Sequence, residues 1–142
     1  MQSTFHYYSP LWTNKTEFNL PGGEAEFDTQ ETKLPTYWNM AFSKICLGMK
    51  IGQQINFIVI NKQANSLYSL IADEGYRALG RNTWKTLIGS QASSQLNCNK
   101  EGFNAACGTQ GSSKARIGML GSNQNTCITC DSRIGFVTRG YQ

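Results

Sequence analysis

The segment from Ala115 to Phe136 constrains the fold more than any other part of the chain, because two short apolar runs flank a long polar loop. The runs ARIGML and SRIGF are apolar, contain glycine and predict two strands. The loop between them carries Asn123, Gln124 and Asn125 and ends in a Cys-X-X-Cys pair. Since such a loop buries little apolar surface, we expect a disulfide, a bound ion or both to hold it. A plain hairpin loop with turn-forming asparagines is the alternative.

The cysteines favour disulfides over a metal or redox centre. Cys98 and Cys107 flank a short polar stretch, Cys127 and Cys130 flank two residues, and Cys46 stands alone. Pairing four of the five leaves several connectivities open. Structural zinc is disfavoured because there is one Cys-X-X-Cys and the single histidine lies far away in the sequence. A redox Cys-X-X-Cys would open a helix, whereas this pair is followed by a predicted strand.

Length and composition indicate one loop-rich domain of extracellular type. The chain has 142 residues, 15% of them charged, and its net charge is +4. Lysine and arginine are scattered, which disfavours nucleic-acid binding. No apolar segment reaches the roughly 18 residues of a membrane span. Nucleophile-elbow, Walker, zinc-protease and dinucleotide motifs are absent, so we expect no enzymatic activity.

Further strands are predicted in the first half of the chain. Residues 2–8 alternate weakly and suggest an edge strand. Runs 45–49 and 55–60, separated by a glycine-containing break, predict a hairpin. Because the second run is apolar throughout 57–60, we expect it to be a central strand covered on both faces.

Two helices are predicted from their capping residues. Ser66 would cap a helix that ends near Gly75, and Asn82 would cap TWKTLIG. Residues 90–114 show no apolar period and predict a long irregular connection, which is typical of a functional segment. No strand is expected after Phe136.

Four blocks in the same order carry a resemblance to a known family. They are TYWNMAFSKICLGMK, SLYSLIADEGYRALGRNTWKTLIG, LNCNKEGFN and ARIGMLGSNQNTCITCDSRIGF. Together they resemble the fibrinogen C-terminal-like domains of secreted invertebrate proteins, closest to the intelectin branch (X-type lectins) and to uncharacterised modules of coral skeletal-matrix proteins. The resemblance implies one α+β domain over residues 1–142, with a mixed sheet, short helices and long disulfide-stapled loops. Family segments are missing at both ends, so we expect an incomplete domain; a Cys98–Cys107 disulfide with Cys46 free would fit this interpretation.

The resemblance also implies a calcium and sugar site. Intelectins use an Asn-X-Glu type of loop before a cysteine, which corresponds here to Asn123, Gln124 and Asn125. Gln124 stands in place of the glutamate, and a neutral amide should lower the calcium affinity. Asp28 matches the family's aspartate ligand. Asn125 would also contact the sugar, and an aromatic residue such as Trp12, Tyr37 or Trp38 would flank it, although aromatic residues are more often part of a core.

These observations predict a secreted, calcium-dependent carbohydrate-binding module that recognises glycans or matrix glycoproteins. The alternative is a structural module of the extracellular matrix that binds neither ion nor sugar. Asn14 begins an Asn-Lys-Thr glycosylation sequon, consistent with a surface loop of a secreted protein. Formation of an oligomer is left open by the sequence.

Overall fold

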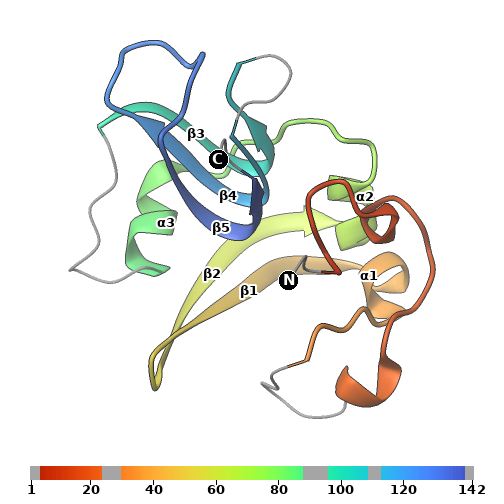
Figure 1. The fold of residues 1–142 in the computed structure, drawn as a ribbon. Coiled ribbons are helices and arrows are strands. Elements are labelled where there is room, and N and C mark those ends of the chain that lie inside the picture. Colours follow the sequence, from red (N-terminus) through yellow and green to blue (C-terminus); the bar gives the residue numbers. More distant parts are fainter. Residues whose placement is uncertain (1–3, 24–29, 88–95, 109–112, 140–142) are drawn as a thin grey trace.

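Antiparallel hairpins and short helices make up the part of the chain that the computed structural model describes, residues 4–23, 30–87, 96–108 and 113–139 (Figure 1). The strands are β1 (Phe42–Ile51), β2 (Gln54–Ala64), β3 (Asn97–Ala106), β4 (Lys114–Ser122) and β5 (Ser132–Arg139). The helices are η1 (Pro10–Trp12), η2 (Leu20–Gly23), α1 (Thr36–Asn39), α2 (Leu67–Ile71) and α3 (Arg81–Leu87). The predicted α+β class is confirmed. All pairings between these strands are antiparallel, where the resemblance implied a mixed sheet.

The predicted hairpin is present as β1 and β2, which form a sheet of two strands. One face carries four buried aliphatic residues, Ile45, Leu47, Ile58 and Ile60. On the other face Phe57 and Val59 are 53% and 58% exposed. The expectation of a central strand covered on both faces is therefore wrong. An apolar run predicts that a segment forms a strand, but it does not predict which other elements pack on the two faces of that strand.

Helix α2 begins as predicted. The Ser66 hydroxyl accepts a hydrogen bond from Ser69 N (3.1 Å), and the Ser69 hydroxyl lies 3.3 Å from Ser66 N, which completes a reciprocal cap. The helix ends at Ile71 rather than near Gly75. The reason is local, because Glu74 has a φ of 61° and leaves the helical region.

Helix α3 starts two residues earlier than predicted, at Arg81, so Asn82 lies within the helix and is not its cap. Trp84 and Leu87, three residues apart and so on one face of the helix, are fully buried. The predicted end of this helix, Ile88 and Gly89, lies outside the described residues.

Strand β3 corrects the prediction of an irregular connection over 90–114. It pairs with β4, which also pairs with β5, giving the order β3-β4-β5. Its sequence conceals the strand because two polar residues, Glu101 and Asn104, occupy buried positions. Both side chains form hydrogen bonds with other groups of the chain. Asn104 Nδ2, for example, donates to Ile71 O (3.0 Å).

The N-terminal segment and the last strand also differ from expectation. Residues 4–8 form turns rather than an edge strand. Tyr7 is buried there, and its carbonyl oxygen accepts a hydrogen bond from Arg116 Nε (3.0 Å). Strand β5 continues past Phe136 to Arg139. None of the described helices has the length and apolar character needed to cross a membrane.

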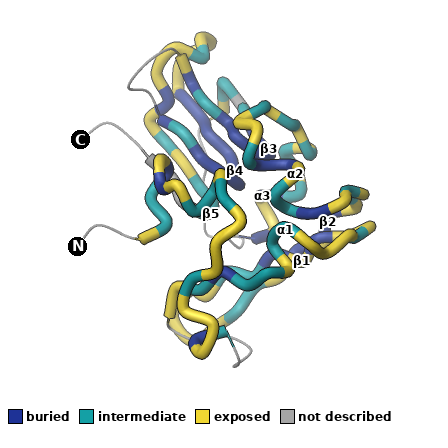
Figure 2. The backbone as a smooth tube through the Cα atoms, turned by 90° about the vertical axis from the view of Figure 1, so that its right-hand side faces the viewer, coloured by how far each residue is buried: buried dark blue, intermediate teal, exposed yellow. Residues whose placement is uncertain are grey.

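The main core lies between the two sheets and the helices that connect them (Figure 2). Its buried members come from β1, β2, α2, α3, β3 and β4: Ile45, Leu47, Ile58, Ile60, Leu70, Ile71, Trp84, Leu87, Phe103, Ile117 and Met119. One carboxylate borders this core. Glu101 accepts hydrogen bonds from Leu79 N (3.0 Å), Gly80 N (2.7 Å) and Trp84 Nε1 (2.8 Å), and so fixes the start of α3 against β3.

We predict that Glu101→Gln lowers the free energy of unfolding by about 1–3 kcal/mol, because an amide group would turn a donor toward buried N–H groups that now face an acceptor. Urea unfolding under non-reducing conditions measures this. Glu17→Gln is the matched control at an exposed position, with an expected change within about 0.5 kcal/mol. Equal effects of the two substitutions would contradict the role assigned to Glu101.

Candidate functional site

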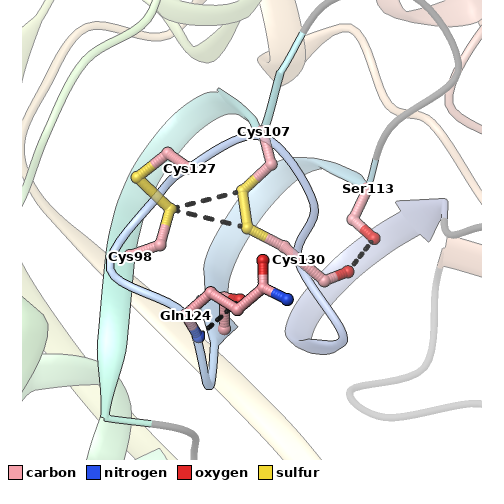
Figure 3. The surroundings of a disulfide bond; sticks show 7 residues. Cys98, Cys107, Ser113, Gln124, Cys127 and Cys130 are labelled. Atoms are coloured by element: carbon pink, nitrogen blue, oxygen red, sulfur yellow. Dashed lines mark hydrogen bonds between the residues drawn. A yellow bond between two sulfur atoms is a disulfide. The ribbon is translucent and has the colours of Figure 1, made fainter.

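Two disulfides lie side by side where the β4–β5 loop meets β3 (Figure 3). They join Cys98 to Cys127 and Cys107 to Cys130, with Cα separations of 5.0 and 6.0 Å. All four disulfide candidates are thus confirmed, and Cys46 is free and exposed. The Cys98–Cys107 disulfide considered in the sequence analysis is not formed. Cys98 lies on β3 and Cys107 directly after it, and each pairs with a cysteine of the β4–β5 loop instead.

Backbone hydrogen bonds hold the loop as well. Gly108 N donates to Cys127 O (2.7 Å), and Asp131 N donates to Gly121 O (3.1 Å). Gly108 has a φ of 66°, and a Cβ at this position would collide with the carbonyl oxygen of Ile128. Only glycine therefore lets the two segments approach this closely. The expectation that disulfides hold this loop is confirmed, and these contacts add to them.

The predicted calcium ligands of the loop lie together at its exposed tip. Asn123, Gln124 and Asn125 are all exposed, and Asn97 Nδ2 donates to the carbonyl oxygen of Asn123 (3.0 Å). The other predicted ligand, Asp28, lies outside the described residues. Among the residues that are described, the groups of three or more His, Cys, Asp or Glu whose ligand atoms converge consist of cysteines, not carboxylates. The tip therefore offers amide oxygens, which are neutral ligands for a cation.

A second candidate site is an apolar cavity of about 470 Å³ beside α1. Residues from the N-terminal segment, α1, the start of β1, α2 and β5 line it: Phe5, Leu11, Trp12, Glu31, Thr32, Lys33, Leu34, Thr36, Tyr37, Met40, Phe42, Leu67 and Phe136. Trp12 packs edge-on against Phe5 and Tyr37, with ring centroids 5.7 and 6.3 Å apart. The Tyr37 hydroxyl donates to Trp12 O (2.8 Å), and burial raises the pKa of this phenol well above its usual value. Tyr37 therefore stays neutral, and its ring remains a fixed wall.

Lys33 stabilises this wall of the cavity by hydrogen bonds to the N-terminal segment. Its Nζ donates to Leu11 O (2.6 Å) and to both the carbonyl oxygen and Oδ1 of Asn14 (2.8 Å each). Nζ also lies 5.0 Å from the centre of the Tyr37 ring and 5.5 Å from that of Trp38. Burial lowers the pKa of Lys33. Because its three protons are directed at the chain itself, Lys33 holds the segment around Asn14 in place rather than offering a donor to a ligand.

The structure does not bring the predicted ligand-binding residues Asn125 and Trp38 together. Asn125 belongs to the β4–β5 loop, at the top of Figure 1, whereas Trp38 belongs to α1, beside the β1–β2 hairpin. Tyr37 rather than Trp38 lines the cavity, and the β5 residue that reaches it is Phe136, on the strand and not in the loop. Sequence reasoning missed this cavity, although the aromatic residues clustered in the first 42 positions were a signal for it.

Comparison of the chain with protein-family models, with curated proteins and with solved structures gave no match. The functional argument therefore rests on the geometry of the two candidate sites.

We predict that peptide mapping without reduction recovers Cys98 joined to Cys127 and Cys107 joined to Cys130. One thiol, that of Cys46, should react with iodoacetamide in the folded chain, because it alone is free and exposed. A Cys46→Ser variant should leave no reactive thiol. Recovery of a peptide that joins Cys98 to Cys107 would contradict the pairing.

Proposed function

We propose that this chain is a secreted carbohydrate-binding module without enzymatic activity, and that it takes one sugar ring of a glycan into the aromatic cavity. The observation that carries the proposal is the cavity itself. Its volume, about 470 Å³, falls within the range of about 300–1,000 Å³ of small-ligand pockets, and its walls are aromatic with few polar groups.

The chemistry of the walls fits a sugar. The apolar C–H face of a pyranose ring can pack on an aromatic side chain such as Trp12 or Tyr37, which supplies a large rigid surface. Glu31 and Thr36 line the same cavity and are exposed, so they can hydrogen-bond to sugar hydroxyls. Lys33 contributes its aliphatic stem, because its donors are already engaged.

Two further observations support a secreted module. Two disulfides are typical of chains that fold in an oxidising compartment. The resemblance to fibrinogen-like and intelectin-like domains implies the same setting and the same class of ligand. We propose this family relationship on the sequence blocks that carry it, together with an α+β fold that is compatible with it.

We predict that Met40→Asp abolishes retention on an immobilised panel of neutral and acidic glycans. Met40 lines the cavity and is 52% exposed. A carboxylate at this position would therefore disfavour apolar contact between the cavity and a ligand, and it would not disturb the core. Leu96→Asp is the matched control, since Leu96 is 79% exposed and does not line the cavity. Affinity chromatography measures both variants. If the unmodified chain is retained by no glycan, or if the two variants behave alike, the proposal fails.

Calcium enters the proposal as a weakly held ion at the loop tip. The amide oxygens of Asn123, Gln124 and Asn125 would supply neutral ligands, and Asp28 would supply the charge. Calcium affinity depends on the number of charged ligands, so we place this site among extracellular sites with dissociation constants of about 10⁻⁴–10⁻³ M. The ion would order the loop and offer open coordination positions to glycan hydroxyls.

We predict that 5 mM Ca²⁺ raises the free energy of unfolding by about 1 kcal/mol if the dissociation constant is about 1 mM, because only the folded chain holds the ion. Gln124→Glu should increase the shift by adding a charged ligand, whereas Asn82→Asp, on an exposed helix position, should not. Thermal unfolding in Ca²⁺ and in chelator measures this. No shift in either the unmodified chain or Gln124→Glu would exclude the calcium site while leaving the cavity proposal intact.

A second candidate function is supported by the outer face of the β1–β2 hairpin. Phe57 and Val59 are more than half exposed there, and Val59 is paired in register with the free Cys46. Adjacent exposed apolar residues favour contact with another macromolecule. A structural matrix module that uses this face becomes the better interpretation if neither glycan nor calcium binds.

A further inference from the structure

We infer that the four disulfide cysteines form a metal site when the chain is reduced, with one soft divalent ion, Zn²⁺ or a mimic of it, held by four thiolates. The basis is the contact between the two disulfides. Cys98 Sγ lies 3.7 Å from Cys107 Sγ and 3.6 Å from Cys130 Sγ, and it is bonded to Cys127 (Figure 3). The sulfur atoms of Cys98, Cys107 and Cys130 thus form one cluster, to which Cys127 Sγ is attached through its bond to Cys98.

The spacing of these sulfurs suits a tetrahedral ion. With Zn–S bonds of about 2.3 Å, the sulfurs of a tetrahedral site lie about 3.8 Å apart. The distances from Cys98 Sγ to the two sulfurs of the other disulfide are already close to this value. Once the disulfides are opened, the two bonded pairs must separate and Cys127 Sγ must turn toward the other disulfide's sulfurs, and the Cα distances of 5.0 and 6.0 Å leave these movements to side-chain rotation.

The cluster does not depend on the sulfur–sulfur bonds for its framework. Cys98 and Cys107 lie on or directly after β3, which is held by its ladder with β4. The loop side is held by Gly108 N to Cys127 O (2.7 Å) and by Ser113 Oγ to Cys130 O (2.7 Å). These bonds persist on reduction, so the four cysteine backbones remain facing one another.

The ligand set selects the kind of ion. The converging group contains only cysteines, and Cys107 and Cys130 are buried. Thiolate sulfur favours zinc and other soft ions, whereas calcium needs oxygen. The sequence argued against zinc because a second Cys-X-X-Cys is lacking, but Cys98 on β3 and Cys107 directly after it supply a second pair of neighbouring sulfurs across eight intervening residues.

The chemistry balances as follows. Each disulfide takes up two electrons and two protons from a thiol or phosphine reductant, which is oxidised, and gives two thiols. Binding of one divalent ion by four thiols then releases four protons and leaves a complex of net charge −2. Oxidation to the two disulfides removes the ligands and releases the ion, so the two states of the cluster exclude each other.

The test uses the full chain reduced with a phosphine under nitrogen and titrated with Co²⁺, a spectroscopic substitute for Zn²⁺. We expect one Co²⁺ per chain, with sulfur-to-metal charge-transfer bands and the visible bands of tetrahedral cobalt. Cys46→Ser should bind equally well, whereas Cys127→Ser should bind roughly tenfold more weakly or worse, because it removes one of four ligands.

A thiol count tests the inference by a readout that does not depend on the cobalt spectrum. With Zn²⁺ present, one thiol should react rapidly, that of Cys46, and five should react after a chelator is added. Five rapidly reacting thiols in excess Zn²⁺, absence of the cobalt bands, or identical binding by Cys127→Ser would each overturn the inference.

Discussion

The arrangement of the chain depends on the hydrogen bonds of the buried guanidinium group of Arg116. Arg116 is 1% exposed near the start of β4 and donates to Tyr7 O (3.0 Å), Asn104 Oδ1 (3.0 Å) and Glu74 Oε1 (3.0 Å). It also lies over the Tyr7 ring, 4.3 Å from its centre. A buried charge is tolerated only when it is fully paired, so the N-terminal segment, β3 and the turn after α2 must all converge on this point. One wall of the aromatic cavity is built from that anchored N-terminal segment.

Apolar patterns predicted a large part of the fold. The runs of β1, β2, β4 and β5 are apolar enough to be recognised, and Ser66 marks the start of α2. Strand β3 was not predicted because Glu101 and Asn104 occupy buried positions where an apolar residue would be expected. Their partners lie far away in the sequence and include backbone groups such as Gly80 N and Ile71 O, and a local sequence pattern does not predict such pairs.

The candidate sites, like the fold, could be predicted from the sequence only in part. Which cysteines are bonded followed from composition, but their pairing depends on which strands are neighbours, and that required β3 to be known. The cavity could not be predicted because its lining comes from distant segments, from Phe5 through Met40 to Phe136. Trp12, Tyr37 and Trp38 were all candidates by residue type, and of these Trp12 and Tyr37 line the cavity. Tyr37 and Trp38 are adjacent on α1, and their positions around the helix decide which of the two faces the cavity.

The two-stranded sheet has a consequence for how copies of the protein behave in solution. Within the described part of the chain, no third strand pairs with β1 or β2, so both strands present backbone donors and acceptors laterally. Such edges invite pairing between molecules, and lysine side chains oppose it. Lys44 and Lys50 are exposed along β1. Their repulsion is screened by salt, so colloidal stability should decline as the ionic strength rises.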